Sequence, residues 1–237
     1  YESISINSES EIPEGFRKIR RKKLFIERIS AGGDVPVASK QEEGSTENAP
    51  SAQKKKSADK KNSRGPAFEG ADVPDNTFQD GKVAELAVAT LREMSQKKEP
   101  FFLAVGFIKP HLPFVAPKKY WDLYNPKDIY VPAFQKLPAG TPEFVGHNNS
   151  ELKSYADIAN DGAIDDATAR RLRHGYYAAI SYMDAQVGLI LDALEKEGLA
   201  DNTVIVLWGD HGWQLGEHGL WHKHTNFEVS ARAPLLI

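Results

Sequence analysis

Two largely apolar runs in the chain, residues 101–107 and 204–208, show no alternation of hydrophobic and polar positions. Such runs are typical of strands that are buried on both faces of a sheet. Two longer segments, residues 80–97 and 166–197, repeat apolar residues at the three- and four-residue spacing of a helix. Helix and buried strand therefore alternate, which predicts an α/β fold with a doubly wound sheet and helices on both faces.

Residues at the helix ends support these limits. Asp80 precedes the first apolar stripe and is expected to cap that helix. Gly198 is expected to end the second helix, because glycine readily takes the left-handed conformation that stops helices. Asp184 lies beside the second stripe. It could be a catalytic carboxylate, but we favour a buried, hydrogen-bonded Asp that fixes a neighbouring loop.

A polar stretch, residues 40–66, has no Leu, Ile, Val or aromatic residue and is dense in Lys, Glu and Ser. It cannot offset the entropy of ordering, so we expect a disordered insertion. The insertion is either a spacer within one domain or a boundary between two. Residues 1–39 would then be a partial N-terminal segment, and residues 67–237 the C-terminal part, of one α/β domain. A basic cluster at residues 17–23 is expected to be a solvated face rather than a site for an anionic polymer.

The ends of the chain suggest that it is an internal fragment of a longer protein. It begins at Tyr1 without a signal-peptide pattern and finishes on an apolar run, residues 234–237. The content of hydrophobic residues, 41%, supports a packed core. The formal net charge of -3 gives no sign of a nucleic-acid or membrane partner, and we expect neither. No run approaches the length of a membrane span, and the absence of cysteine excludes thiol chemistry within this chain.

Ionisable residues follow directly after the second apolar run. Gly209 ends the run, and Asp210 and His211 come next. A strand that ends in a carboxylate and an imidazole places them at the carboxyl edge of the sheet, where α/β folds bind ligands. The alternatives are a polar turn at Asp210 and a solvated loop at residues 218–224. Many glycine and tryptophan residues surround these positions, which favours a shaped site.

A second pair, Lys109 and His111, follows the first apolar run. Pro110 and Pro113 keep the residues before them extended, so this segment is expected to be stiff. We expect the pair to share one sheet edge with Asp210, although a single His in such a place can also be a structural residue. The loop at residues 115–150 is expected to be long and ordered, with short helical turns, and to form the wall of a pocket.

These residue types permit metal-assisted hydrolysis of an anionic ester. Asp210 and His211 can supply oxygen and nitrogen ligands to a divalent metal. Lys223, in the same Gly-bearing loop, can offset the charge of a tetrahedral oxyanion such as sulfate or phosphate. His111 can donate a proton to a leaving alkoxide. The chain offers no nucleophile, so the attacking group must lie elsewhere.

Three stretches carry a resemblance to a known family: GDHGWQLGEHGLWHKHTNFEVSARAPLLI, PFFLAVGFIKPHLPFVAPKKYWDLY and DVPDNTFQDGKVAE. Over about residues 64–237 the chain resembles the type I sulfatases, most closely their iduronate-2-sulfatase-like branch. The resemblance implies the alkaline-phosphatase-like α/β fold with a mixed sheet, incomplete in this chain. It also implies hydrolysis of a sulfate ester by a formylglycine made from Cys or Ser, with a calcium ion in the site.

The resemblance also implies roles for single residues. Asp210 and His211 match a pair of calcium ligands, Lys223 a lysine that contacts the sulfate, and His111 a histidine beside the sulfate and its leaving oxygen. Lys109 is either structural or substrate-binding. The family's Cys/Ser-x-Pro-x-Arg motif and an early Asp-Asp pair are absent and are expected upstream. Imidazole suits zinc or manganese better than calcium, but we follow the resemblance and expect calcium.

The leading functional hypothesis is a sulfatase that acts on a sulfated carbohydrate such as a 2-O-sulfated uronic acid. The present chain alone is expected to be inactive. The alternatives are a phosphodiesterase or phosphonate hydrolase of the same superfamily, and a non-catalytic relic that binds sulfated glycans. By resemblance the protein is expected to be exported, to the periplasm, the outside of the cell or a lysosome. The oligomeric state cannot be derived from the sequence.

Overall fold

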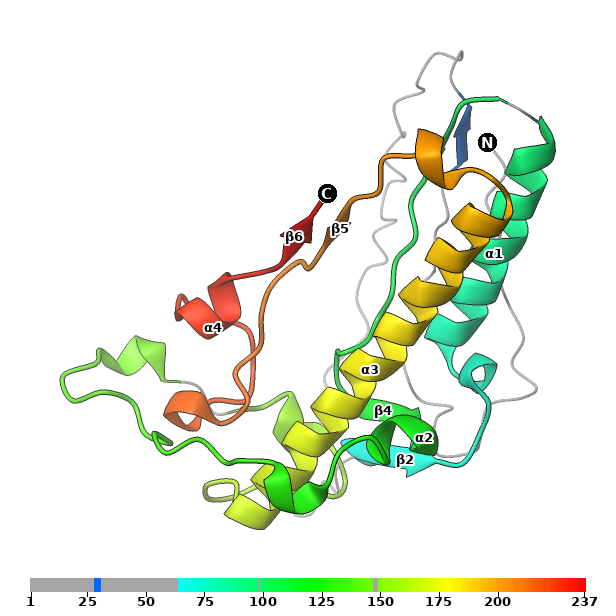
Figure 1. Cartoon of the computed structure of the whole chain (residues 1–237). Coiled ribbons are helices and arrows are strands. Elements are labelled where there is room, and N and C mark those ends of the chain that lie inside the picture. The colour runs from blue at the N-terminus through cyan, green and yellow to red at the C-terminus, as the bar shows by residue number, and fades with distance from the viewer. Residues whose placement is uncertain (1–27, 31–63, 98, 147–148) are drawn as a thin grey trace, which may run out of the picture.

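Two long helices, α1 (Gln79–Lys97) and α3 (Asp166–Lys196), run side by side through the molecule (Figure 1). The structure is a computed structural model and describes residues 28–30, 64–97, 99–146 and 149–237. The two helices closely match the segments predicted from apolar spacing. Leu91 of α1 packs on Ala193 and Leu194 of α3, so the predicted stripes do face each other.

The predicted capping role of Asp80 is wrong. Asp80 is the second residue of α1 and is buried, and its carboxylate accepts hydrogen bonds from the backbone N–H groups of Ile108 (3.0 Å) and Lys109 (2.8 Å). Two tertiary hydrogen bonds to a charged acceptor outweigh one local cap. The acid therefore ties α1 to the segment that leads to His111.

The limits predicted for α3 are confirmed. Asp165 caps its N-terminus by accepting a hydrogen bond from the N–H of Thr168 at 2.8 Å, and Gly198 follows its end with a φ of 68°. The prediction that Asp184 is buried is wrong, because its side chain is exposed. Tyr182 and Gln186, one turn apart, take the inward face of this turn, which leaves Asp184 on the outward face.

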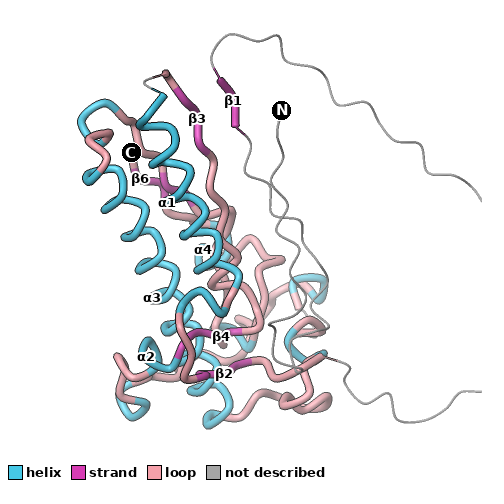
Figure 2. Tube along the Cα trace, turned by 90° about the vertical axis from the view of Figure 1, so that its right-hand side faces the viewer, coloured by secondary structure: helices cyan, strands magenta, loops and turns pink. Residues whose placement is uncertain are grey.

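The strands are shorter than the sequence predicts, and the described residues form three two-stranded sheets (Figure 2). Strands β2 (Phe68–Ala71) and β4 (Phe114–Pro117) are parallel. Strand β3 (Phe101–Leu103) pairs with β1 (Arg28–Ser30), and β5 (Leu207–Trp208) pairs with β6 (Leu235–Leu236), both antiparallel.

Burial of the two apolar runs on both faces is not observed. Phe102 is 58% exposed, Val204 82% and Trp208 67%. Each run has one partner strand, and no described element covers both of its faces. The strands before His111 and Asp210 also belong to different sheets, so the expected shared sheet edge is not present among the described residues.

The largest core cluster lies where β2, β4, α3 and the loop after β5 meet. Phe114 at its centre is fully buried and makes edge-to-face contacts with Tyr176 and Trp213. Truncating such a side chain to Ala costs about 3–5 kcal/mol. The cluster comprises Ala67, Phe68, Leu112, Phe114, Leu152, Tyr155, Ile158, Ala169, Leu172, Trp213, Leu215 and Trp221. It therefore joins the segment after His111 to the loop before Lys223.

Short helical turns punctuate residues 115–146, as predicted for this loop. They are α2 (Lys118–Trp121) and the 3-10 turns η3 (Pro126–Asp128) and η4 (Glu143–Val145). Further short elements are η2 (Asp75–Thr77), η5 (Leu152–Ser154), η6 (Ala200–Asn202), η7 (Glu217–Gly219) and α4 (Glu228–Ala231).

Most of the predicted insertion, residues 40–63, lies outside the described residues, as does the basic cluster at residues 17–23. The last residues assigned to that insertion are part of the fold, because Arg64 forms a β-bridge with Tyr155 and Gly65 accepts a hydrogen bond from the N–H of Ala156 at 3.2 Å. Within the described ranges no helix has both the length and the apolar character needed to cross a membrane.

Candidate functional site

His111 and Lys223 meet although 112 positions separate them. Nζ of Lys223 lies 2.8 Å from Nε2 of His111, and Nδ1 of the same ring lies 2.8 Å from the carbonyl oxygen of Leu112. A carbonyl only accepts hydrogen bonds, so Nδ1 carries the ring proton and Nε2 accepts from the lysine ammonium. Burial lowers the pKa of His111, and the charges of Lys223 and Lys109 lower it further. The imidazole is therefore held neutral beside a cation.

Trp213 forms the floor beneath this pair. Its indole ring lies 5.9 Å from the ring of His111, edge to face, and Nζ of Lys223 lies 5.2 Å from its centroid. The second distance is that of a cation–π interaction. Trp213 is only 6% exposed and belongs to the main core cluster, so the floor is rigid. Its role was not predicted, although a tryptophan in a Gly-rich loop was the available signal.

Lys109 points its ammonium at its own segment. Nζ donates hydrogen bonds to the carbonyl oxygens of His111 (2.8 Å) and Pro113 (2.7 Å), while its backbone N–H is held by Asp80. The peptide bonds before Pro110 and Pro113 are both cis. Burial lowers the pKa of Lys109 to about 8, and the Asp80 carboxylate opposes this shift. Two of the three ammonium donors thus hold the backbone around His111.

Glu151 is a further charged residue at this site, and nothing in the sequence pattern marks it. Its Oε1 atom lies 3.6 Å from Nε2 of His111, the same nitrogen that contacts Lys223. A carboxylate and an ammonium therefore face the same nitrogen of the His111 ring. Glu151 follows the loop that was predicted to form the wall of a pocket, and it lies just before η5.

Asp210 and His211 contact each other. The N–H of His211 donates to Oδ1 of Asp210 at 3.0 Å, and Nδ1 of His211 lies 2.6 Å from the carbonyl oxygen of Gly212. Nε2 of the same ring stands 3.4 Å from Oδ2 of Asp210. Gly212 is required here, since a Cβ would lie 1.9 Å from the carbonyl oxygen of Val229.

The donor chemistry of this pair suits one side of a divalent cation site. A carboxylate that is 85% exposed and the Nε2 atom of an imidazole lie next to each other, and both atom types can bind such a cation. No cluster of three or more His, Cys, Asp or Glu that could hold a metal occurs within the described part of the chain. Asp210 and His211 can therefore supply two ligands, and further ligands must come from elsewhere.

Among the described residues, side-chain contacts join His111 to Lys223 but join neither of them to Asp210 or His211. The link between the two pairs is the loop that starts at Gly209. Arg173 of α3 anchors this loop: it is buried and donates to the carbonyl oxygen of Leu215 at 2.8 Å and to Oε1 of Glu217 at 3.0 Å. Oε2 of Glu217 in turn accepts from the N–H of Leu215 at 2.6 Å.

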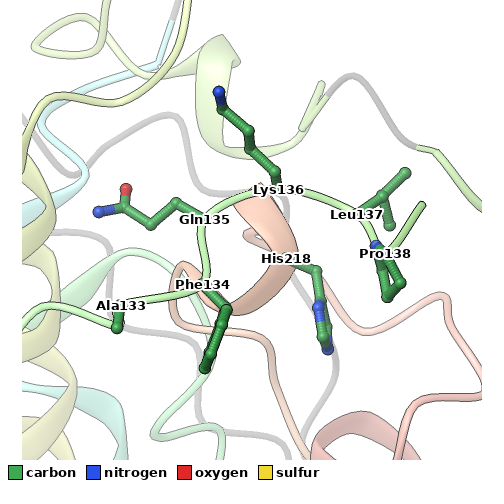
Figure 3. Close-up of a pocket in the computed structure, with 7 residues that line it drawn as sticks. All are labelled: Ala133, Phe134, Gln135, Lys136, Leu137, Pro138 and His218. Atoms are coloured by element: carbon green, nitrogen blue, oxygen red, sulfur yellow. The ribbon is translucent and has the colours of Figure 1, made fainter.

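A pocket of about 590 Å³ opens beside the same loop (Figure 3). It is lined by Ala133, Phe134, Gln135, Lys136, Leu137, Pro138 and His218, none of which was a predicted site residue. The N–H of His218 donates to the carbonyl oxygen of Phe134 at 2.8 Å. Residues 133–138 of the predicted loop line a pocket, as expected, but one that is mostly apolar.

Known proteins resemble this chain over most of its length. A family model described as sulfatase matches residues 37–237. The chain is 39% identical, over 173 residues, to an iduronate 2-sulfatase of Mus musculus; the match covers 70% of this chain and 31% of that protein. It is 36% identical, over 176 residues, to a choline-sulfatase of Rhizobium meliloti, covering 71% and 34%. The chain thus spans about a third of the length of these relatives.

A solved structure shares the fold. A phosphonate monoester hydrolase of Silicibacter pomeroyi matches with a TM-score of 0.57 at 25% identity, over 69% of this chain and 33% of that one. The predicted alkaline-phosphatase-like α/β fold is confirmed by this likeness, even though the sheets of the described residues are small. With the family model covering residues 37–237 and relatives near 40% identity, the chain belongs to the sulfatase family.

Proposed function

We propose that the full-length protein hydrolyses sulfate esters of carbohydrates, such as a 2-O-sulfated uronic acid. The observation that carries this proposal is the contact between Lys223 and His111 over the buried ring of Trp213. A cation beside a neutral imidazole is the arrangement needed to hold an oxyanion next to a proton carrier. The similarity to an iduronate 2-sulfatase supports the choice of substrate.

Lys223 binds the sulfate group by turning its ammonium from His111 to a sulfate oxygen. His111 then holds a proton on Nε2 for the oxygen of the leaving alcohol, while Nδ1 stays on the Leu112 carbonyl. For Lys109 the contacts favour the structural alternative over substrate binding, because its ammonium is engaged by two backbone carbonyls.

Asp210 and His211 would hold a calcium ion, with the remaining ligands supplied by chain outside the described residues. Calcium would neutralise charge on the sulfate oxygens and orient them. A formylglycine, expected upstream of this chain, would supply the attacking oxygen. Export of the full-length protein is part of the same proposal and is supported by family membership.

A phosphonate or phosphate diester is the second candidate substrate, because the solved structure with the same fold is a phosphonate monoester hydrolase. A non-catalytic protein that binds sulfated glycans is the third. These candidates differ in the product that is released and in the effect of removing Lys223.

The test uses the full-length protein with calcium present. Release of inorganic sulfate from a 2-O-sulfated uronic acid is compared with hydrolysis of a phosphonate monoester, for the wild type and for Lys223→Ala. Sulfate release that falls at least about 100-fold in the variant supports the proposal. Faster turnover of the phosphonate favours the second candidate, and binding of the sugar without any turnover favours the third. Equal rates of wild type and variant would overturn the assignment of Lys223.

A further inference from the structure

Neither the family resemblance of the chain nor the sequence pattern assigns a role to Glu151. Its Oε1 atom faces Nε2 of His111 at 3.6 Å, and both side chains are a little over one quarter exposed. Lys223 contacts the same nitrogen at 2.8 Å. One ring atom thus stands between an ammonium and a carboxylate.

The carboxylate is placed by a rigid segment. The next residue, Leu152, is fully buried in the main core cluster, and the carbonyl oxygen of Glu151 accepts hydrogen bonds from Oγ (2.6 Å) and N–H (3.2 Å) of Ser154. Two positions before Glu151, the side chain of Asn149 is held by the loop that carries Lys223. Its Oδ1 accepts from the N–H of Trp221 at 2.8 Å, and its Nδ2 donates to the carbonyl oxygen of Gly219 at 3.1 Å.

We propose that Glu151 is a positioning residue that keeps a proton on Nε2 of His111 once Lys223 has turned to the bound sulfate ester. This inference rests on the proposed function. In the free site Lys223 donates to Nε2 and the ring is neutral. When the anion draws Lys223 away, Nε2 faces the carboxylate, which stabilises the imidazolium.

The protons balance in this scheme. Nε2 takes one proton from solvent after Lys223 leaves it, and Nδ1 keeps its proton on the Leu112 carbonyl. As the attacking oxygen proposed above bonds to sulfur, the bond from sulfur to the alcohol oxygen breaks. Its electron pair stays on the alcohol oxygen, which takes the Nε2 proton, and the sulfuryl group stays on the attacking oxygen. The ring ends neutral, ready to accept from Lys223 again.

The groups around the His111 ring shift its pKa in opposite directions. Among the described residues, Lys223 and Lys109 face His111 as cations and lower its pKa, whereas Glu151 raises it. The Leu112 carbonyl, bonded to Nδ1, also raises it, and burial lowers it. Removing Glu151 therefore lowers the pKa of His111, so that the ring loses its second proton at a lower pH.

The test is the pH profile of kcat for Glu151→Gln in the full-length enzyme, with sulfate release from a 2-O-sulfated uronic acid as the assay. A general acid is active while protonated, so kcat falls as pH rises through its pKa in the complex. In Glu151→Gln we expect this alkaline limb of the profile to shift to lower pH by roughly 0.5 to 1 pH unit. The rate above the limb then falls roughly 3- to 10-fold, and the rate well below it stays within about twofold.

The exposed Asp161, ten positions further along the same connecting segment, provides the control, and Asp161→Asn should leave the limb in place. A uniform loss of kcat at every pH in Glu151→Gln, or an unchanged profile, would overturn the inference. The first result would show a structural role only.

A second readout does not depend on turnover. The ring nitrogens of His111 are titrated by NMR in the same protein without substrate. The His111 pKa should fall in Glu151→Gln and rise in Lys223→Met, since these variants remove charges of opposite sign from one nitrogen. If the wild type releases no sulfate, the proposed function fails, but this titration still decides whether Glu151 acts on His111. No change in Glu151→Gln would refute that action.

Discussion

The two halves of the candidate site are held in different ways. His111 and Lys223 touch each other across 112 positions and rest on Trp213, which is buried in the main core cluster. The backbone N–H of His211 donates to Asp210, the His211 ring contacts the Gly212 carbonyl, and Asp210 is 85% exposed. The His111–Lys223 pair, for which we propose sulfate binding, is thus built by long-range packing within this chain. The Asp210–His211 pair, for which we propose metal binding, would need further ligands from outside the described residues.

The largest effects are expected in the packed half. Lys223→Ala should lower kcat/KM by roughly 10²–10³-fold and His111→Ala by roughly 10²–10⁴-fold, since each removes a group that acts on the transition state. Because the two side chains touch, the double variant should lose much less than the product of the single losses. Steady-state kinetics of the full-length enzyme measure this cycle. Losses that simply multiply would mean that the two residues act independently.

Substitutions at the exposed pair, Asp210 and His211, should act by weakening metal binding. Asp210→Asn replaces an anionic ligand by a neutral one, so calcium affinity should fall by roughly tenfold or more, because calcium sites depend on the number of charged ligands. Calorimetric titration of the metal-free enzyme with calcium measures it. The NMR signals of the His111 ring should stay unchanged in this variant. Unchanged calcium affinity would remove Asp210 from the metal site.

A smaller effect should distinguish a structural from a substrate-binding Lys109. The pKa of this lysine is about 8 in the fold, below its usual value of 10.5. Between these two values the unfolded chain binds more protons than the native one, so the free energy of unfolding should rise with pH from 8 to 10.5, by at most about 3 kcal/mol.

Lys109→Met should abolish that rise, as measured by denaturant unfolding of the full-length enzyme at several pH values. Lys82→Met, which alters a partly exposed lysine of α1, should keep it. The same slope in wild type and Lys109→Met would show that the ammonium of Lys109 is not desolvated in the fold.

The smallest effect concerns Asp184, for which the sequence left a catalytic role open. Its side chain is exposed on the outward face of α3. Asp184→Asn should therefore change kcat/KM by less than about twofold, as expected for a surface substitution, and steady-state kinetics check it. A loss of tenfold or more would restore the catalytic alternative.

Local signals predicted the two long helices, and they missed what depends on tertiary contacts. The apolar spacing of α1 and α3 sets their limits, because a helix face is defined by residues three and four apart. The Gly-bearing loop after Asp210 and the Lys-Pro-His segment predicted that Lys223 and His111 lie at one site, and the structure does bring these two side chains together.

The rest could not be predicted for physical reasons. The roles of Asp80 and Glu151 depend on residues 28 and 40 positions away, and no local pattern reports such contacts. The apolar run ending at Trp208 has the composition of a buried strand, but its burial depends on neighbouring elements that the described residues do not provide.

One measurement tests most directly that His111 and Lys223 serve a single sulfate ester, with His111 at the leaving oxygen. The kcat/KM of wild type and His111→Ala is compared for a 2-O-sulfated uronic acid and for 4-nitrophenyl sulfate. A sugar alkoxide needs a proton to leave, whereas nitrophenolate does not. We expect the loss to be at least roughly tenfold greater on the sugar substrate. Equal losses on both substrates would contradict this role of His111.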